Sequence, residues 1–208
     1  MEFTISNTGE NLDFWRQKSY LSETTKYLLS TADILIVPEE DFREYPLPVF
    51  QRNTLSVLDF LKETLKVEVA IDDENFREVA LNSRVHKIGK FVVNVIALPL
   101  FVGLITNYAY DLLKHEDPKE QIELEIVVDK NGNGKTIKFK GTVDELKKVK
   151  QDIIDLRDGN DNGNRTDWDY YLNAPKLRQL TQQAKSGTVR DRAGIRLVLR
   201  LIRLKVRL

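Results

Sequence analysis

Apolar residues in the first third of the chain follow patterns that predict a strand, a helix and a second strand. The segment from Asn11 to Leu29 predicts a first helix, and DILIVP (Asp33 to Pro38) is a short apolar run typical of a buried strand. NTLSVLDFLKETL then has leucines at helical spacing, with Asn53 placed to cap the helix. Because VEVAID (Val67 to Asp72) alternates as a strand does, we expect a parallel strand pair joined by a crossover helix.

A second group of elements is predicted further along the chain. IELEIVV and TIKFKG are strand-like, and the Asn-Gly pair in DKNGNGK between them is a strong signal for a hairpin turn. TVDELKKVKQDIIDL predicts a helix, because Thr142 and Glu145 have the spacing of a capping box. Residues 119–156 are therefore expected to form a compact ββα unit.

The longest apolar run, FVVNVIALPLFVGLITNYAYDLL from Phe91, has two interpretations. No charge lies between Lys90 and Asp111, and residues 91–110 are long enough to span a membrane. Alternatively, the run breaks at Pro99 into two shorter helices that cover a small sheet. We favour the break, which makes the run a buried core or a partner-binding helical region.

Together these elements predict a mixed α/β (α+β) fold. We expect residues 1–156 to form the α/β domain around a small sheet with an apolar helical centre. Residues 157–169, rich in Asn, Gly and Asp, predict a polar loop. Residues 170–208 predict a basic helical segment.

The 208-residue chain has a formal net charge of zero, but the charge is unevenly distributed. From Lys176 to the end there are ten basic residues and one acidic residue, a net charge of +9, so the first 175 residues carry −9. Five arginines in this segment have the spacing of one helical stripe: Arg192, Arg196, Arg200, Arg203 and Arg207. A basic amphipathic helix predicts binding to an anionic membrane surface or an acidic protein partner, or packing against the acidic remainder of the chain. Nucleic acid is less favoured, since no aromatic residue in the stripe is placed to stack on bases.

The absence of cysteine excludes disulfides and thiol-based zinc or redox chemistry. The first thirty residues lack the basic and apolar regions of a signal peptide. These two features favour a cytoplasmic protein, with membrane association through the basic segment as an extension of that expectation. Neither feature indicates the oligomeric state.

DGNDNGNRTDWD, which begins at Asp158, resembles an EF-hand or dockerin-type calcium loop. Oxygen-bearing side chains stand at positions 1, 3, 5, 9 and 12 of such a loop: Asp158, Asn160, Asn162, Thr166 and Asp169. The resemblance implies a calcium site formed by these residues. A polar linker is the alternative, because Arg165 stands where the family has an apolar residue and no matching second loop is present.

Motifs for catalysis are sparse. DKNGNGKT shares its last residues with a phosphate-binding loop, but the first glycine is missing and a strand follows, so we favour a hairpin turn. Three carboxylates follow the second predicted strand: Asp72, Asp73 and Glu74. They predict either a metal site at the end of a strand or a solvated turn or helix cap, and we favour the turn or cap. The two histidines, His86 and His115, are isolated among charged neighbours.

The leading hypothesis is a non-catalytic interaction or accessory protein. In this hypothesis an apolar helical region or the basic segment binds a protein partner or a membrane surface. The first alternative is a small integral membrane protein with a span near residues 91–110. The second is a metal-dependent enzyme or calcium-binding module that uses Asp72, Asp73 or the loop from Asp158.

Overall fold

The computed structural model describes residues 1–43, 47–79, 85–114, 116–117 and 119–158. The chain divides into two units, Met1–Gly163 and Asn164–Leu208, and all the described residues belong to the first. The division expected at residues 156 and 169 stays a prediction.

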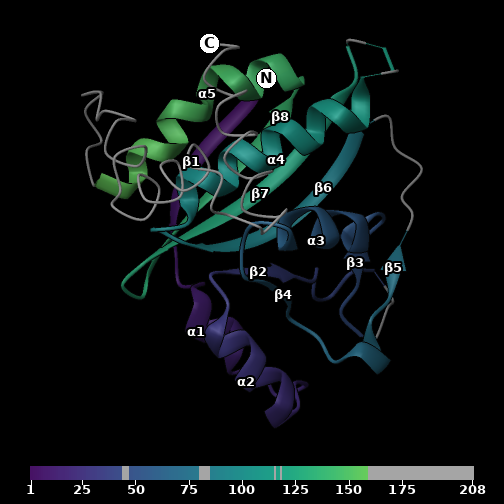
Figure 1. The fold of residues 1–208 in the computed structure, drawn as a ribbon, viewed down its shortest axis with the longest axis vertical. Helices are drawn as coiled ribbons and strands as arrows, with labels where there is room; N and C mark the ends of the chain where they lie inside the picture. Colours follow the sequence, from purple (N-terminus) through teal and green to yellow (C-terminus); the bar gives the residue numbers. More distant parts are fainter. Residues whose placement is uncertain (44–46, 80–84, 115, 118, 159–208) are drawn as a thin grey trace, which may run out of the picture. The chain divides into compact units, whose positions relative to one another are not determined.

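The first unit is built on a mixed six-stranded sheet with the order β1-β8-β7-β6-β2-β4 (Figure 1). In that order the strands are β1 (Glu2–Thr8), β8 (Asn133–Gly141), β7 (Gln121–Lys130), β6 (Val85–Asn94), β2 (Ile34–Val37) and β4 (Val67–Val69). The β6–β7 and β2–β4 pairs are parallel, and the other three pairs are antiparallel. Two short strands, β3 (Phe50–Gln51) and β5 (Glu78–Val79), form a separate parallel pair. The mixed α/β fold expected from the sequence is confirmed.

Helices pack on both faces of the sheet (Figure 1). One core joins the sheet to three helices, α3 (Thr54–Lys62), α4 (Leu98–Leu113) and α5 (Val143–Asp155). A smaller core on the opposite face joins it to α1 (Leu12–Arg16) and α2 (Glu23–Thr31). Two short 3-10 helices, η1 (Asp73–Asn75) and η2 (Leu156–Asp158), follow β4 and α5. Each face of the sheet is therefore covered by a different set of helices.

The expected strand–helix–strand start is present as β2, α3 and β4, with β2 and β4 parallel. Asn53 occupies the N-cap position of α3, but its side chain makes no capping hydrogen bond because its backbone is left-handed, with φ 72°. The single helix expected from Asn11 to Leu29 is wrong. Two helices occupy that region, and each has its own cap, Asn11 for α1 and Ser22 for α2.

The apolar run from Phe91 breaks before Pro99, as expected, but its first part is a strand and not a helix. β6 ends at Asn94, and α4 begins at Leu98 with Pro99 in its first turn. Phe91 packs into the larger core and Val92 into the smaller one, so this end of β6 is buried on both faces. Such a strand reads as an unbroken apolar run, because neither face needs polar residues. Within the described ranges, no helix is long and apolar enough to cross a membrane.

The ββα unit expected near residues 119–156 is confirmed as β7, β8 and α5. Asn131 (φ 55°) and Gly132 (φ 82°) form the two-residue turn, the left-handed geometry that favours Asn-Gly in hairpins. Thr142 and Glu145 make both hydrogen bonds of the capping box at the start of α5. The residues compared with a phosphate-binding loop lie in this hairpin and not at the start of a helix.

Candidate functional site

A polar surface occupies the part of the sheet that α1 and α2 leave uncovered. On β7, Leu124 and Ile126 face the larger core beneath α4 and α5, so the alternating Glu123 and Glu125 face the other way. Val127, one step further along, lies in the smaller core under α1 and α2. We define the open face by the polar side chains on this side of four strands: Glu2, Thr4, Ser6, Lys87, Lys90, Glu123, Glu125, Lys138 and Lys140.

Charges on the open face alternate in sign from strand to strand. In one row, the register places Glu2, Lys140, Glu123 and Lys87 beside one another on β1, β8, β7 and β6. The Nζ atom of Lys140 lies 3.8 Å from Glu2, and that of Lys87 lies 3.4 Å from Glu123. Opposite charges at directly paired strand positions attract, so this row is favourable throughout.

The next row contains the two most buried charged side chains of the open face, Lys90 and Glu125. Glu125 receives two lysines, with Lys138 Nζ at 3.3 Å and Lys90 Nζ at 3.2 Å. The Lys90 ammonium also lies 2.7 Å from the carboxylate of Glu10. Burial by itself would lower the pKa of Lys90, but the hydrogen bond to Glu10 and the charges of Glu125 and Glu10 outweigh it and raise the pKa. Lys90 therefore holds its proton firmly.

Glu10 reaches this row because the chain crosses tightly over β8 between β1 and α1. A Cβ atom added to Gly134 would overlap the backbone carbonyl oxygen of Glu10, so only glycine permits this crossing. The indole N–H of Trp15 donates to the Glu10 carboxylate at 3.0 Å. These two contacts fix the position of the Glu10 side chain against Lys90.

Buried Asp129 ties the start of α1 to the turn of the hairpin. Its carboxylate accepts from the backbone N–H of Leu12 at 3.0 Å and from that of Gly132 at 2.8 Å. The Asn11 side chain also donates to the Gly132 carbonyl at 2.9 Å. α1 is thereby held at the border of the open face.

The open face is hollowed into a depression of about 660 Å³. Its wall opposite β1 is formed by Phe14 and Trp15 of α1 and by the segment from Pro38 to Glu40. Lys18 lies over the wall, with its Nζ 4.2 Å from the centre of the Phe14 ring and 2.7 Å from Glu40. On the same rim, Glu39 accepts from Gln51 at 2.7 Å. The depression is therefore bounded by polar groups that already have partners and by one half-exposed aromatic ring.

This arrangement suits binding better than covalent chemistry. A nucleophilic or Schiff-base lysine needs a lowered pKa, whereas the pKa of Lys90 is raised. Lys150 has a pKa lowered by burial, but it lies on α5 against Gly103 of α4, on the opposite side of the sheet. The open face thus offers alternating charges and hydrogen-bonding groups to a ligand.

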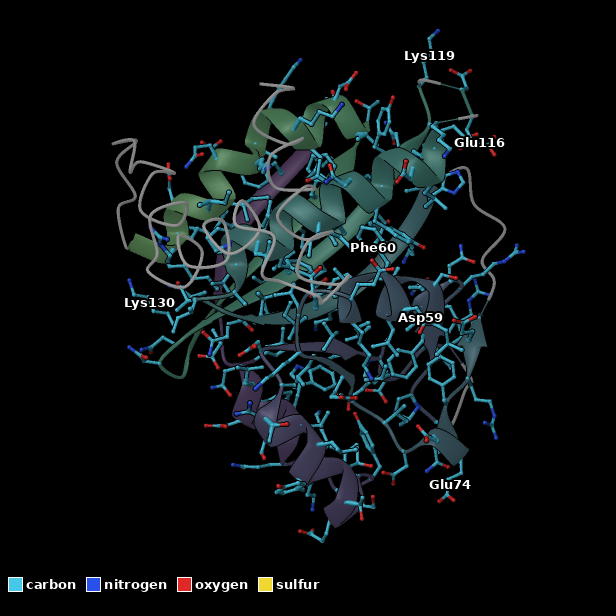
Figure 2. The ribbon with its side chains drawn as sticks, viewed as in Figure 1. Asp59, Phe60, Glu74, Glu116, Lys119 and Lys130 are labelled. Carbon is cyan, nitrogen blue, oxygen red and sulfur yellow. The ribbon has the colours of Figure 1, made fainter. Side chains whose placement is uncertain are left out.

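Of the three carboxylates that follow β4, Asp72 supports the start of α2. Asp72 accepts hydrogen bonds from the hydroxyl groups of Ser22 and Thr25 and from the backbone N–H of Ser22, at the start of α2. The hydrogen bond from Thr25, together with those from Ser22, outweighs the effect of burial and lowers the pKa of Asp72. Asp73 and Glu74 lie in η1, and Glu74 is at the periphery of the molecule (Figure 2). In the described ranges, no group of three or more acidic or histidine side chains is placed to hold a metal ion.

The other residues expected to bind ligands fall outside the described part of the chain. Asp158 ends η2, while Asn160, Asn162, Thr166 and Asp169 lie beyond the described residues. The five arginines of the basic stripe also lie beyond them. The calcium site and the basic surface therefore stay predictions. His86 pairs with Glu120 at the start of the β6–β7 pair.

The residues at the centre of the open face were missed by sequence reasoning. A usable signal was present in the hairpin, because its Asn-Gly turn places Glu125 opposite Lys138 and Glu123 opposite Lys140. The contributions of Glu10 and Lys90 depend on strands that pair across long stretches of sequence, and no local pattern indicates them.

No protein-family model, curated protein or solved structure compared with the chain matches it.

Proposed function

We propose that residues 1–158 form a non-catalytic interaction module that binds a protein partner through the open face. The observation that carries this proposal is the alternation of paired glutamates and lysines across four strands around a depression. Adjacent strands lie about 4.8 Å apart. This spacing is close to the distance of about 5–6 Å between side chains three or four residues apart on a helix. The expected partner surface carries both signs of charge.

A partner of mixed charge is favoured over a strongly anionic or cationic one. Each lysine of the open face already has a carboxylate nearby. A ligand with charges of only one sign would therefore be attracted by the side chain on one strand and repelled by the side chain on the next. Alternating charges give register and specificity more than raw affinity. Half of the residues of α4 are buried in the core, which makes the open face a better candidate surface than the apolar helical region.

The experiment compares two double variants of equal charge change. Lys138→Glu with Lys140→Glu alters exposed residues of the open face, and Lys147→Glu with Lys148→Glu alters exposed residues of α5 on the other side of the sheet. A photo-crosslinking residue at Ser6, which lines the depression, identifies the partner in cells. Purified partner should then bind the open-face variant at least about tenfold more weakly and the α5 variant as tightly as the unaltered chain. Equal binding by both variants would contradict the proposal.

We further propose that the basic segment, residues 170–208, makes a second contact with an anionic surface. The net charge of +9 from Lys176 onward supports this proposal. The full chain should sediment with vesicles that contain anionic lipid and remain in solution with zwitterionic vesicles. Replacement of the five stripe arginines by glutamine should abolish sedimentation, and vesicle binding that survives this change would contradict the proposal.

A further inference from the structure

Within the described part of the chain, the outer edge of β1 is unusually open for the edge of a sheet. β1 is seven residues long, whereas the strand at the other edge, β4, has three. Protected edge strands are short or carry proline, inward-pointing charge, lysine or a bulge, because free backbone groups otherwise pair with other chains. β1 contains no proline, lysine or arginine, and its pairing with β8 is regular from Glu2 to Thr8. Among the described strands, only β8 pairs with it.

The backbone groups that β1 directs outward follow from the hairpin. A two-residue turn closes with Lys130 and Asn133 exchanging backbone hydrogen bonds, and the direction of these groups then alternates along β8. Even-numbered residues of β8 therefore bond to β1, which uses the N–H and C=O groups of its own even-numbered residues. The N–H and C=O groups of Phe3, Ile5 and Asn7 point outward.

These outward groups are complementary to those of an identical strand. An antiparallel β1 from a second copy, centred on Ile5, places Ile5 opposite Ile5 and Phe3 opposite Asn7. All three positions are then of the hydrogen-bonded kind, so every outward N–H and C=O of the three residues obtains a partner. The half-exposed Ile5 side chains meet at the centre of the pair.

Charge does not oppose this pairing. Glu2 is the only charged residue of β1, and the same register places it opposite Thr8, far from the second Glu2. From these observations we propose that the chain forms a homodimer in which the two β1 strands pair antiparallel about Ile5. The six-stranded sheets then join into one sheet, with both open faces on the same side.

This dimer is expected to be reversible. A contact made by one strand from each copy buries less surface than stable interfaces bury, which indicates dissociation in the micromolar range. Light scattering coupled to size-exclusion chromatography, over roughly 5–200 µM protein, should show the mass rise from that of one chain, 24.1 kDa, toward twice that value. A mass that stays at 24.1 kDa throughout would overturn the proposal.

Two variants distinguish β1 pairing from dimerisation through another surface. Ile5→Pro removes an outward N–H that β8 does not use, and edge strands tolerate proline at such positions. The symmetric dimer loses two hydrogen bonds, so dissociation should become at least about tenfold easier. Ile5→Lys places two ammonium groups opposite each other and should weaken the dimer in the same way.

Leu28→Lys on α2 is the matched control, since Leu28 is exposed to a similar degree as Ile5 and lies on a different element. It should leave dimerisation unchanged. If Ile5→Pro alters the circular dichroism spectrum, Ile5→Lys decides the outcome. Dimerisation of Ile5→Lys as tight as that of Leu28→Lys would overturn the proposal.

Discussion

Removal of the Lys90 ammonium tests whether its ion pairs with Glu10 and Glu125 stabilise the protein. Lys90→Met keeps most of the side-chain volume and leaves the carboxylates of Glu10 and Glu125 without their shared cation. Removing one partner of a fully buried ion pair costs about 3–5 kcal/mol. The Lys90 side chain is 18% exposed and the two carboxylates about a quarter exposed, so we expect a smaller loss of about 2–3 kcal/mol.

Lys138→Met is the matched control, because it removes the same charge from the same acceptor, Glu125. The Lys138 side chain is 66% exposed, and exposed ion pairs contribute about 0–1 kcal/mol. Urea unfolding followed by circular dichroism gives both free energies of unfolding. A loss in Lys90→Met no larger than that in Lys138→Met would refute the interpretation of this row as a buried network.

The pH dependence of the free energy of unfolding supplies a second, independent test of the role of Lys90. Since the folded pKa of Lys90 is raised, its stabilisation is present below the pKa of lysine in the unfolded chain and is lost as the pH rises through the folded pKa. The difference in stability between the unaltered chain and Lys90→Met should therefore shrink as the pH rises through the pKa of Lys90. A difference that stays constant over that rise would contradict the mechanism.

Three further predictions concern other positions. Gly134→Ala should destabilise the fold by about 2–4 kcal/mol in urea unfolding, because the new methyl group meets the Glu10 carbonyl, whereas Gly9→Ala, with open space around it, should change stability little. Asp72→Ala should cost about 1 kcal/mol, because the Ser22 N–H and the hydroxyl groups at the start of α2 lose their shared acceptor. Because the pKa of Asp72 is lowered in the folded chain, this stabilisation is present above the ordinary pKa of a carboxyl group and is lost as the pH falls through the folded pKa. The melting temperatures of the unaltered chain and of Asp72→Ala should therefore converge in acid. Calorimetric titration with calcium should give binding that Asp158→Ala removes, and the absence of heat from the unaltered chain would exclude the calcium site.

The elements that could be predicted from the sequence are those specified by neighbouring residues. The turn at Asn131 and Gly132 and the capping box of Thr142 and Glu145 gave β7, β8 and α5. Each signal acts within four residues, so tertiary contacts do not have to be known. The same turn also determined which glutamates and lysines of the hairpin pair on the open face.

The elements that were missed depend on distant parts of the chain. The buried end of β6 is apolar on both faces, which periodicity cannot distinguish from a buried helix. β1 is mostly polar, and its partner β8 lies more than a hundred residues away. Lys90 and Glu10 belong to these two regions, so the centre of the open face could not be predicted without them.

The pairing of β1 with β8 also has a consequence for the order of folding during synthesis. Glu2–Thr8 obtains its strand partner only when residues 134–140 are available, more than a hundred residues later in synthesis. Pairings between such distant segments form slowly, because the intervening chain must first be ordered. A ribosome-bound chain that ends before β8 therefore holds a first strand with both edges unpaired, and such edges are sites of aggregation during synthesis. A rearranged chain that begins at α1 and carries the β1 sequence directly after β8 would reduce this long-range pairing to a single hairpin.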